Sequence, residues 1–210
     1  MAINPKFPYP LYLVLSEKDC IHMPMQDVAR EAILGGVDII QYRAKKLTPD
    51  ATYFNALRLK MLCDKHGIPL IINDHVSIAK DLGAWGVHVG RSDMAPMAVR
   101  DLVGDKIKIG WSLESLDQLN DPQISVVDHL GVSPIYKTKT KTNTVIEWGL
   151  EGLQQIRQLT DLPLIAIGNM NMDTAAATYK AGADSIAVVS AICSSPNPRE
   201  AAESLKALLI

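Results

Sequence analysis

Short apolar segments recur along the chain, each separated from the next by a longer amphipathic or polar stretch. Val, Ile and Leu occupy both faces of these segments instead of alternating with polar residues, which is typical of parallel strands covered by helices. Strands are therefore predicted near residues 11–15, 37–42, 69–72, 86–89, 107–111, 127–132, 163–167 and 185–189.

Several of the intervening stretches carry helix signals. The clearest has Thr48 as an N-cap, Pro49 in the first helical position and Gly67 at its end. Further helices are predicted within residues 25–36, 171–184 and 198–210. Eight β/α units indicate an α/β fold, a (β/α)8 TIM barrel, as a single compact domain over residues 1–210. An open doubly wound sheet is the alternative, but it usually has fewer strands. The polar segment 133–148 is interpreted as a mobile active-site loop.

Composition narrows the class of partner. The net charge is −2, which argues against general binding to nucleic acid or a membrane surface. Cys20, Cys63 and Cys193 show no CxxC spacing, so they are interpreted as free thiols in a reducing compartment. The N-terminal stretch lacks the pattern of a leader peptide, and no apolar run has transmembrane length. A cytoplasmic protein is expected, and a homo-oligomer is left open.

Residues suited to phosphate follow the second predicted strand. Alternate side chains of a strand share a face, so Gln41, Arg43 and Lys45 are expected to point together. Arg offers a planar fork of donors and Lys a point charge, and both suit phosphate. A solvated strand end is the alternative.

Two carboxylates follow the next strands. Asp74 comes after Asn73 at the end of one strand, and Asp93 follows the next. Mg²⁺ commonly takes one or two carboxylates and completes its shell with substrate phosphate and water. Asp74 and Asp93 are therefore candidate Mg²⁺ ligands. The alternative is that each caps a helix.

Other polar residues follow the later strands. Many barrels bind a phosphate with the loops that follow strands seven and eight. Gly168 follows the seventh predicted strand and would let a phosphate approach the backbone there. The alternatives are a solvated loop around residues 138–141 and a tight turn at Gly168. The candidate binding residues that follow the later strands are Ser112, Thr138, Thr140, Lys141, Gly168, Val189 and Ser190.

Other chemistries find little support. The five histidines lack zinc-binding spacing, and Ser190 lacks the GxSxG setting of a hydrolase. His88 is interpreted as a core residue. Trp111 is left open between pocket lining and core packing.

The motifs QYRAK, IINDH, GVHVGRSD, IGWS, GVSPIYKTKTK, GLEGL, IAIGNM and AVVSAI occur in this order over essentially the whole chain. In this combination the chain resembles the thiamine-phosphate synthase (thiamine-phosphate pyrophosphorylase) family. The resemblance departs at Ala44, where an acidic residue is usual, at Asn169-Met170, where Gly-Ile is usual, and at Lys137, where Pro is common.

The resemblance implies a barrel that joins hydroxymethylpyrimidine diphosphate to hydroxyethylthiazole phosphate and releases pyrophosphate. It implies that Asp74 and Asp93 ligate Mg²⁺. The pyrimidine diphosphate would be held by Gln41, Arg43, Lys45, Asn73, Ser112 and Lys141, and the thiazole phosphate by Thr138, Thr140, Gly168, Val189 and Ser190. Arg43, Lys45, Lys141 and Ser112 are the residues expected to serve catalysis, with no protein nucleophile.

Two other functions are weighed. A thiazole tautomerase-like isomerase on the same barrel would generally lack the acidic pair and carry His where Trp111 stands. A non-catalytic barrel that binds thiamine phosphate would be expected to have lost a metal or diphosphate residue. Neither difference from the synthase pattern is present in the sequence.

Overall fold

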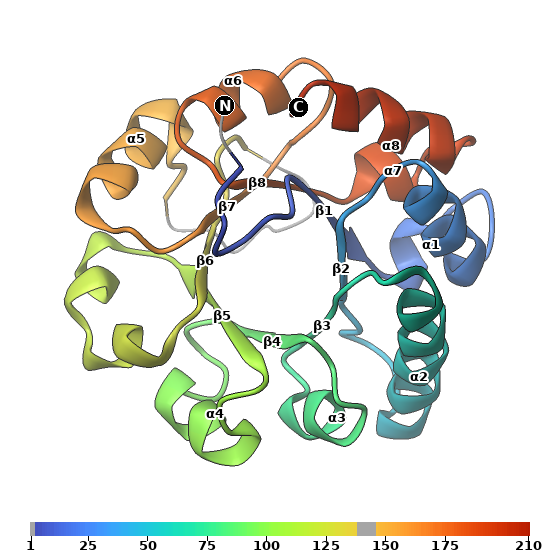
Figure 1. Ribbon diagram of the computed structural model, residues 1–210, viewed down its shortest axis with the longest axis horizontal. Coiled ribbons are helices and arrows are strands. Elements are labelled where there is room, and N and C mark those ends of the chain that lie inside the picture. The colour runs from blue at the N-terminus through green and yellow to red at the C-terminus, as the bar shows by residue number, and fades with distance from the viewer. Residues whose placement is uncertain (1–2, 138–145) are drawn as a thin grey trace.

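The computed structural model describes residues 3–137 and 146–210 (Figure 1). Within them, eight parallel strands pair in chain order and β1 pairs with β8, so the barrel is closed and the predicted (β/α)8 fold is confirmed. The strands are β1 Leu11–Leu15, β2 Ile39–Tyr42, β3 Leu70–Asn73, β4 Gly86–Val89, β5 Lys108–Leu113, β6 His129–Val132, β7 Leu164–Ile167 and β8 Ser185–Val188.

Helices surround the strands as an outer ring (Figure 1). The α-helices are α1 Met25–Leu34, α2 Pro49–His66, α3 Val76–Asp81, α4 Pro96–Val103, α5 Gly149–Leu159, α6 Ala175–Lys180, α7 Ser190–Cys193 and α8 Pro198–Ala207. The predicted start of α2 is confirmed, because the Thr48 side chain accepts a hydrogen bond from the Ala51 N–H. The left-handed Gly67 ends the same helix. No helix in the described part of the chain is long and apolar enough to cross a membrane.

The connection between β5 and β6 departs from the helical pattern. Two 3-10 helices, η2 Leu116–Asn120 and η3 Pro122–Val126, replace an α-helix there. Pro122 disfavours a helical conformation at Asp121, and the Asp121 carboxylate instead accepts from the Gln123 N–H. A third, η1 Glu17–Asp19, follows β1.

Strand residues divide into an outer and an inner set. Outward side chains such as Leu13, Ile40 and Val87 pack under the helices in the main hydrophobic core. Inward side chains form a smaller apolar cluster around Phe7, which precedes β1. The inner cluster comprises Phe7, Tyr12, Val14, Ile39, Ile71, Ile165 and Ala187.

Aspartates stand immediately before three of the strands, at the amino-terminal end of the barrel. Each carboxylate accepts from the backbone N–H of a neighbouring strand: Asp38 from Leu11 at 2.8 Å, and Asp184 from Leu164 at 2.8 Å. Asp128 does the same with Ile109. A helix supplies each with a cation, namely Lys206 to Asp38, Arg100 to Asp128 and Arg157 to Asp184. These contacts fasten the end of the barrel opposite to the strand ends that carry the candidate site.

Candidate active site

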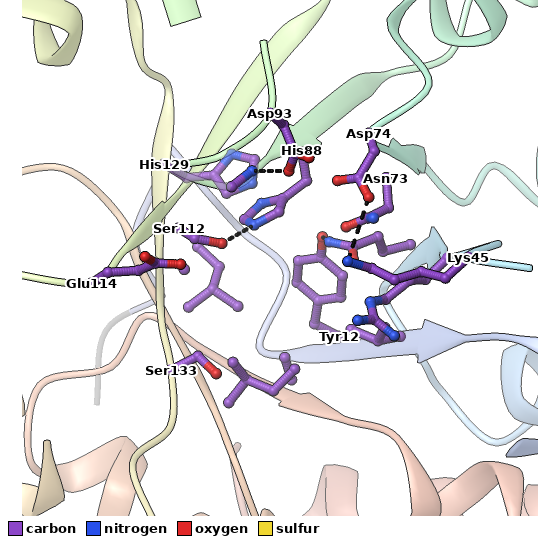
Figure 2. Close-up of a pocket in the computed structure, with 18 of the residues that line it drawn as sticks. Tyr12, Lys45, Asn73, Asp74, His88, Asp93, Ser112, Glu114, His129 and Ser133 are labelled. Atoms are coloured by element: carbon purple, nitrogen blue, oxygen red, sulfur yellow. Dashed lines mark hydrogen bonds and ion pairs between the residues drawn. The ribbon is translucent and has the colours of Figure 1, made fainter. Parts of the chain in front are cut away.

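A cavity opens where the strands end, and Figure 2 shows the polar side chains that point into it. Side chains from β2, β3 and β5 and from the loops after β2, β3 and β4 line it together. The structure therefore brings together seven of the residues singled out from the sequence. These are Gln41, Arg43, Lys45, Asn73, Asp74, Asp93 and Ser112.

The basic side of the cavity follows from strand geometry. Gln41, Arg43 and Lys45 face the cavity as alternate residues, while Ala44 between the two cations is buried in the outer core. The Arg43 N–H donates to the Leu15 carbonyl, which holds the segment against β1 just past the end of β2. Gln41 is buried, and its Nε2 donates to the Tyr12 hydroxyl at 2.7 Å.

The acidic side is built from two loops. Asp74 has a positive φ of 64°, which Asp tolerates better than most residues, and its N–H donates to the His88 carbonyl. The Asp93 carboxylate accepts from the Gly90 N–H at 2.7 Å. The capping alternative is wrong, because the N-cap residues are His75 in α3 and Ala95 in α4, and neither helix has a side-chain cap.

Opposite charges meet across the cavity. Lys45 Nζ lies 3.7 Å from Asp74 Oδ2, a contact drawn in Figure 2. Burial raises the pKa of Asp74, and the nearby Asp93 carboxylate raises it further by repulsion and a shared hydrogen bond. Lys45 and Arg43 act in the opposite direction, but the net shift is upward. The two carboxylates thus form a close pair that the two cations only partly compensate.

A second cavity adjoins the first and shares Arg43 with it. Gly168, Val189 and Ser190 line this second cavity. Gly168 has a φ of +116°, and a Cβ there would lie 2.7 Å from the Pro134 side chain, so no other residue fits without strain. Thr138, Thr140 and Lys141 lie outside the described residues, and their assigned roles stay predictions.

Residues 11–192 match the family model for thiamine monophosphate synthase. The chain belongs to the thiamine monophosphate synthase family. It is 44% identical to thiamine-phosphate synthase of Albidiferax ferrireducens over 95% of this chain and 91% of that protein. It is 39% identical to the Vibrio parahaemolyticus enzyme of the same name, over 96% and 98%. Thiamine phosphate pyrophosphorylase from Pyrococcus furiosus superposes with a TM-score of 0.87 at 29% identity, covering 98% of both chains.

The departures from the thiamine monophosphate synthase pattern now have a structural setting. Ala44 is buried, so an acidic side chain here would stand on the outer side of the strand end, away from the cavity. Asn169 adopts a φ of 53° directly after Gly168 and lines the second cavity. Asn is one of the non-glycine residues that enter the left-handed region most readily, so it can occupy this position.

Sequence reasoning missed several cavity residues. Tyr12, His88, Glu114, His129 and Ser133 also line the first cavity. The interpretation of His88 as a core residue is wrong, because its Nε2 lies 3.0 Å from Ser112 Oγ within the cavity. The available signal was the alternation in Gly-Val-His-Val, which sets His88 on the opposite face from the two buried valines.

Trp111, which the sequence left open between pocket lining and core packing, and Tyr42 both lie outside the first cavity. Trp111 is 4% exposed and belongs to the outer core, so core packing holds for it. Tyr42 is buried there too, and its hydroxyl donates to the Glu17 carboxylate. Among the described tyrosines and tryptophans, Tyr12 alone lines the first cavity.

Proposed function

We propose that this chain is a thiamine-phosphate synthase, which condenses hydroxymethylpyrimidine diphosphate with hydroxyethylthiazole phosphate to give thiamine phosphate and pyrophosphate. One observation carries the proposal. A basic group and a carboxylate pair face each other in one cavity, and Arg43 joins that cavity to a second one. A diphosphate with its cation and a second phosphorylated substrate need an arrangement of this kind.

The pyrimidine diphosphate is assigned to the first cavity. Arg43 and Lys45 bind its phosphates by charge-assisted hydrogen bonds. Gln41 and Asn73, which are both buried, recognise the aminopyrimidine with their amide groups, and Ser112 adds a hydroxyl. Lys141 is assigned to the same diphosphate on the resemblance alone.

Asp74 and Asp93 are the residues that would hold Mg²⁺. Both are hard oxygen donors, and a bound cation would offset the burial and the carboxylate repulsion that raise the pKa of Asp74. The described residues contain no cluster of three or more His, Cys, Asp and Glu side chains suited to a metal. Mg²⁺ fits nevertheless, because substrate phosphate and water supply its other ligands. When bound, it would supply positive charge beside the departing pyrophosphate.

The reaction proceeds by a dissociative route. The bond between the pyrimidine methylene carbon and the diphosphate oxygen breaks first, and pyrophosphate carries away the electron pair. The electron-rich aminopyrimidine stabilises the resulting cation, and the thiazole nitrogen then forms the new carbon–nitrogen bond. No protein nucleophile takes part. Arg43 and Lys45 stabilise the charge that develops on the leaving group, and the cavity holds the two reacting atoms close together.

The thiazole phosphate is assigned to the second cavity. The turn at Gly168 exposes backbone there, and Ser190 adds a hydroxyl beside it. Thr138 and Thr140 join this group on the resemblance alone. Because Arg43 borders both cavities, it can bind the diphosphate while the thiazole ring reaches the methylene carbon.

The two alternatives have less support. A thiazole tautomerase-like isomerase would make no use of a carboxylate pair beside a basic group, and the relatives reported above carry the synthase name. A non-catalytic thiamine-phosphate-binding barrel would retain product binding but release no pyrophosphate.

The deciding experiment is a coupled assay for pyrophosphate, run with both substrates, each substrate alone, and with EDTA before and after added Mg²⁺. Both substrates together should release pyrophosphate in step with thiamine phosphate, EDTA should stop the reaction, and Mg²⁺ should restore it. Asp93→Ala should lower kcat by about 10²–10³-fold while its circular dichroism stays that of the parent protein. Absence of pyrophosphate from the complete mixture would refute the synthase assignment.

A further inference from the structure

Two histidines face each other inside the barrel, below the polar rim of the first cavity (Figure 2). His88 comes from β4 and His129 from β6, and their ring centres are 6.2 Å apart. In the pairing of the strands, His88 stands beside Gly110 of β5, and Gly110 stands beside His129. The two imidazoles therefore belong to one layer of the barrel and flank a glycine.

That glycine is the reason both rings fit. A Cβ on Gly110 would lie 2.3 Å from His129 Nε2 and 2.6 Å from His88 Nδ1. A Cβ on Gly131 would lie 2.9 Å from the His88 ring. Any larger residue at Gly110 would displace both rings. The two nitrogens thus border the same small gap, which one bridging water can span.

His129 stands out by its burial. It is 1% exposed, and neither of its ring nitrogens has a hydrogen-bond partner among the described residues. Leaving such a nitrogen unsatisfied costs the free energy of its desolvation. Burial lowers the pKa of His129 to about 3, so the ring stays neutral and keeps one N–H and one lone pair. The nitrogen that faces the gap must therefore be either a donor or an acceptor.

We propose that His129 is a positioning residue that acts through His88 on the Ser112 hydroxyl. The proposal rests on the proposed function, in which Ser112 touches the pyrimidine substrate. His88 Nε2 lies 3.0 Å from Ser112 Oγ. If His129 Nε2 accepts across the gap, His88 Nδ1 carries the proton, His88 Nε2 accepts from Ser112, and Ser112 offers lone pairs to the substrate. If His129 Nε2 donates, each role reverses and Ser112 donates to the substrate. His129 thereby determines whether Ser112 accepts a hydrogen bond from the pyrimidine substrate or donates one to it.

The test replaces the nitrogens of His129 one at a time. His129→Leu removes both, His129→Gln restores a polar atom near Nε2, and His129→Asn restores one near Nδ1. We expect His129→Leu to raise KM for the pyrimidine diphosphate about tenfold, with KM for the thiazole phosphate unchanged. His129→Gln should recover most of this loss and His129→Asn should not, because Nε2 faces the gap. In a Ser112→Ala background His129→Leu should add no further loss.

Thr178→Val provides a control for the loss of a buried polar group outside both cavities, since Thr178 is fully buried and its hydroxyl donates to the Thr174 carbonyl at the start of α6. Nitrogen NMR should show one tautomer of His88 in the parent protein and a mixture in His129→Leu. Equal losses for both substrates, additivity with Ser112→Ala, or equal recovery by Asn and Gln would overturn the proposal. A parent protein that forms no thiamine phosphate would instead refute the proposed function.

Discussion

At the scale of single residues, the carboxylate pair is the least relaxed feature of the site. Asp74 combines a left-handed backbone, partial burial and a neighbouring carboxylate, and each of these disfavours its ionised form or its conformation. An acidic residue with a folded pKa above its unfolded value destabilises the fold at neutral pH and does so less as pH falls. Such a site favours an incoming cation, because the cation removes the repulsion.

Asp93→Asn should therefore lower the pKa of Asp74 toward the ordinary range near 3.9. In EDTA at neutral pH it should also raise the unfolding free energy, by less than about 1 kcal/mol because Asp93 is exposed. The gain should fade as pH falls through the raised folded pKa of Asp74, and it should be gone below the ordinary Asp pKa, where Asp74 is protonated in both states. Carboxyl-carbon NMR titration measures the first effect and urea unfolding at several pH values the second. An Asp74 pKa that rises in the variant would contradict the assigned repulsion.

At the scale of elements, the residues that stabilise the barrel and the residues of the candidate active site lie at opposite ends of the strands. The strands were predictable because a strand buried on both faces is a run of apolar residues. Only the predicted strand ends differ from the observed ones. For example, the strand predicted from residue 37 begins at Ile39, because Asp38 lies before it and its carboxylate binds the Leu11 N–H. The two 3-10 helices between β5 and β6 were not predicted, although Pro122, which disfavours a helical conformation at Asp121, is visible in the sequence. Aspartates before β2, β6 and β8 bind backbone and helix cations at one end, while Arg43, Lys45 and Asp74 stand at the other.

A matched pair of substitutions tests this separation. Asp184→Ala leaves the Leu164 N–H, Arg157 and Asn4 without their carboxylate, so we expect about 1–3 kcal/mol less unfolding free energy and kcat/KM within about twofold. Lys45→Ala should do the reverse, with kcat/KM lower by about 10²–10³-fold and unfolding free energy within about 0.5 kcal/mol. Urea unfolding and steady-state kinetics on both variants give the comparison. Two variants with the same pattern would show that the ends of the barrel are not separate in function.

At the scale of the whole molecule, the rim could be predicted from the sequence and the interior could not. Residues just past parallel strands reach a common edge whatever the details of packing, so Arg43 and Asp74 were predictable neighbours. The depth of the cavity depends instead on which inward positions hold glycine. Gly110 and Gly131 admit His88 and His129, and that relation appears only when the strand register is known. Residues 138–145, with Lys141 among them, lie outside the described structure.

Ligand binding should stabilise the molecule as a unit if the rim holds a cation and a diphosphate together. A ligand that binds only the folded state at 100 times its Kd adds about 2.7 kcal/mol, which for a chain of this size raises Tm by roughly 5–10 °C. We expect that shift with Mg²⁺ and pyrophosphate together, and a smaller one with either alone. Asp74→Asn should lose the part that depends on Mg²⁺, and Lys45→Ala the part that depends on pyrophosphate. Asp184→Ala should have a lower Tm without ligands, but the ligands should raise that Tm by the full amount, because Asp184 lies at the other end of the barrel. A full Tm shift in Asp74→Asn would show that the cation does not bind at the carboxylate pair. The absence of a Tm shift in the parent protein would refute a joint site for the cation and the diphosphate.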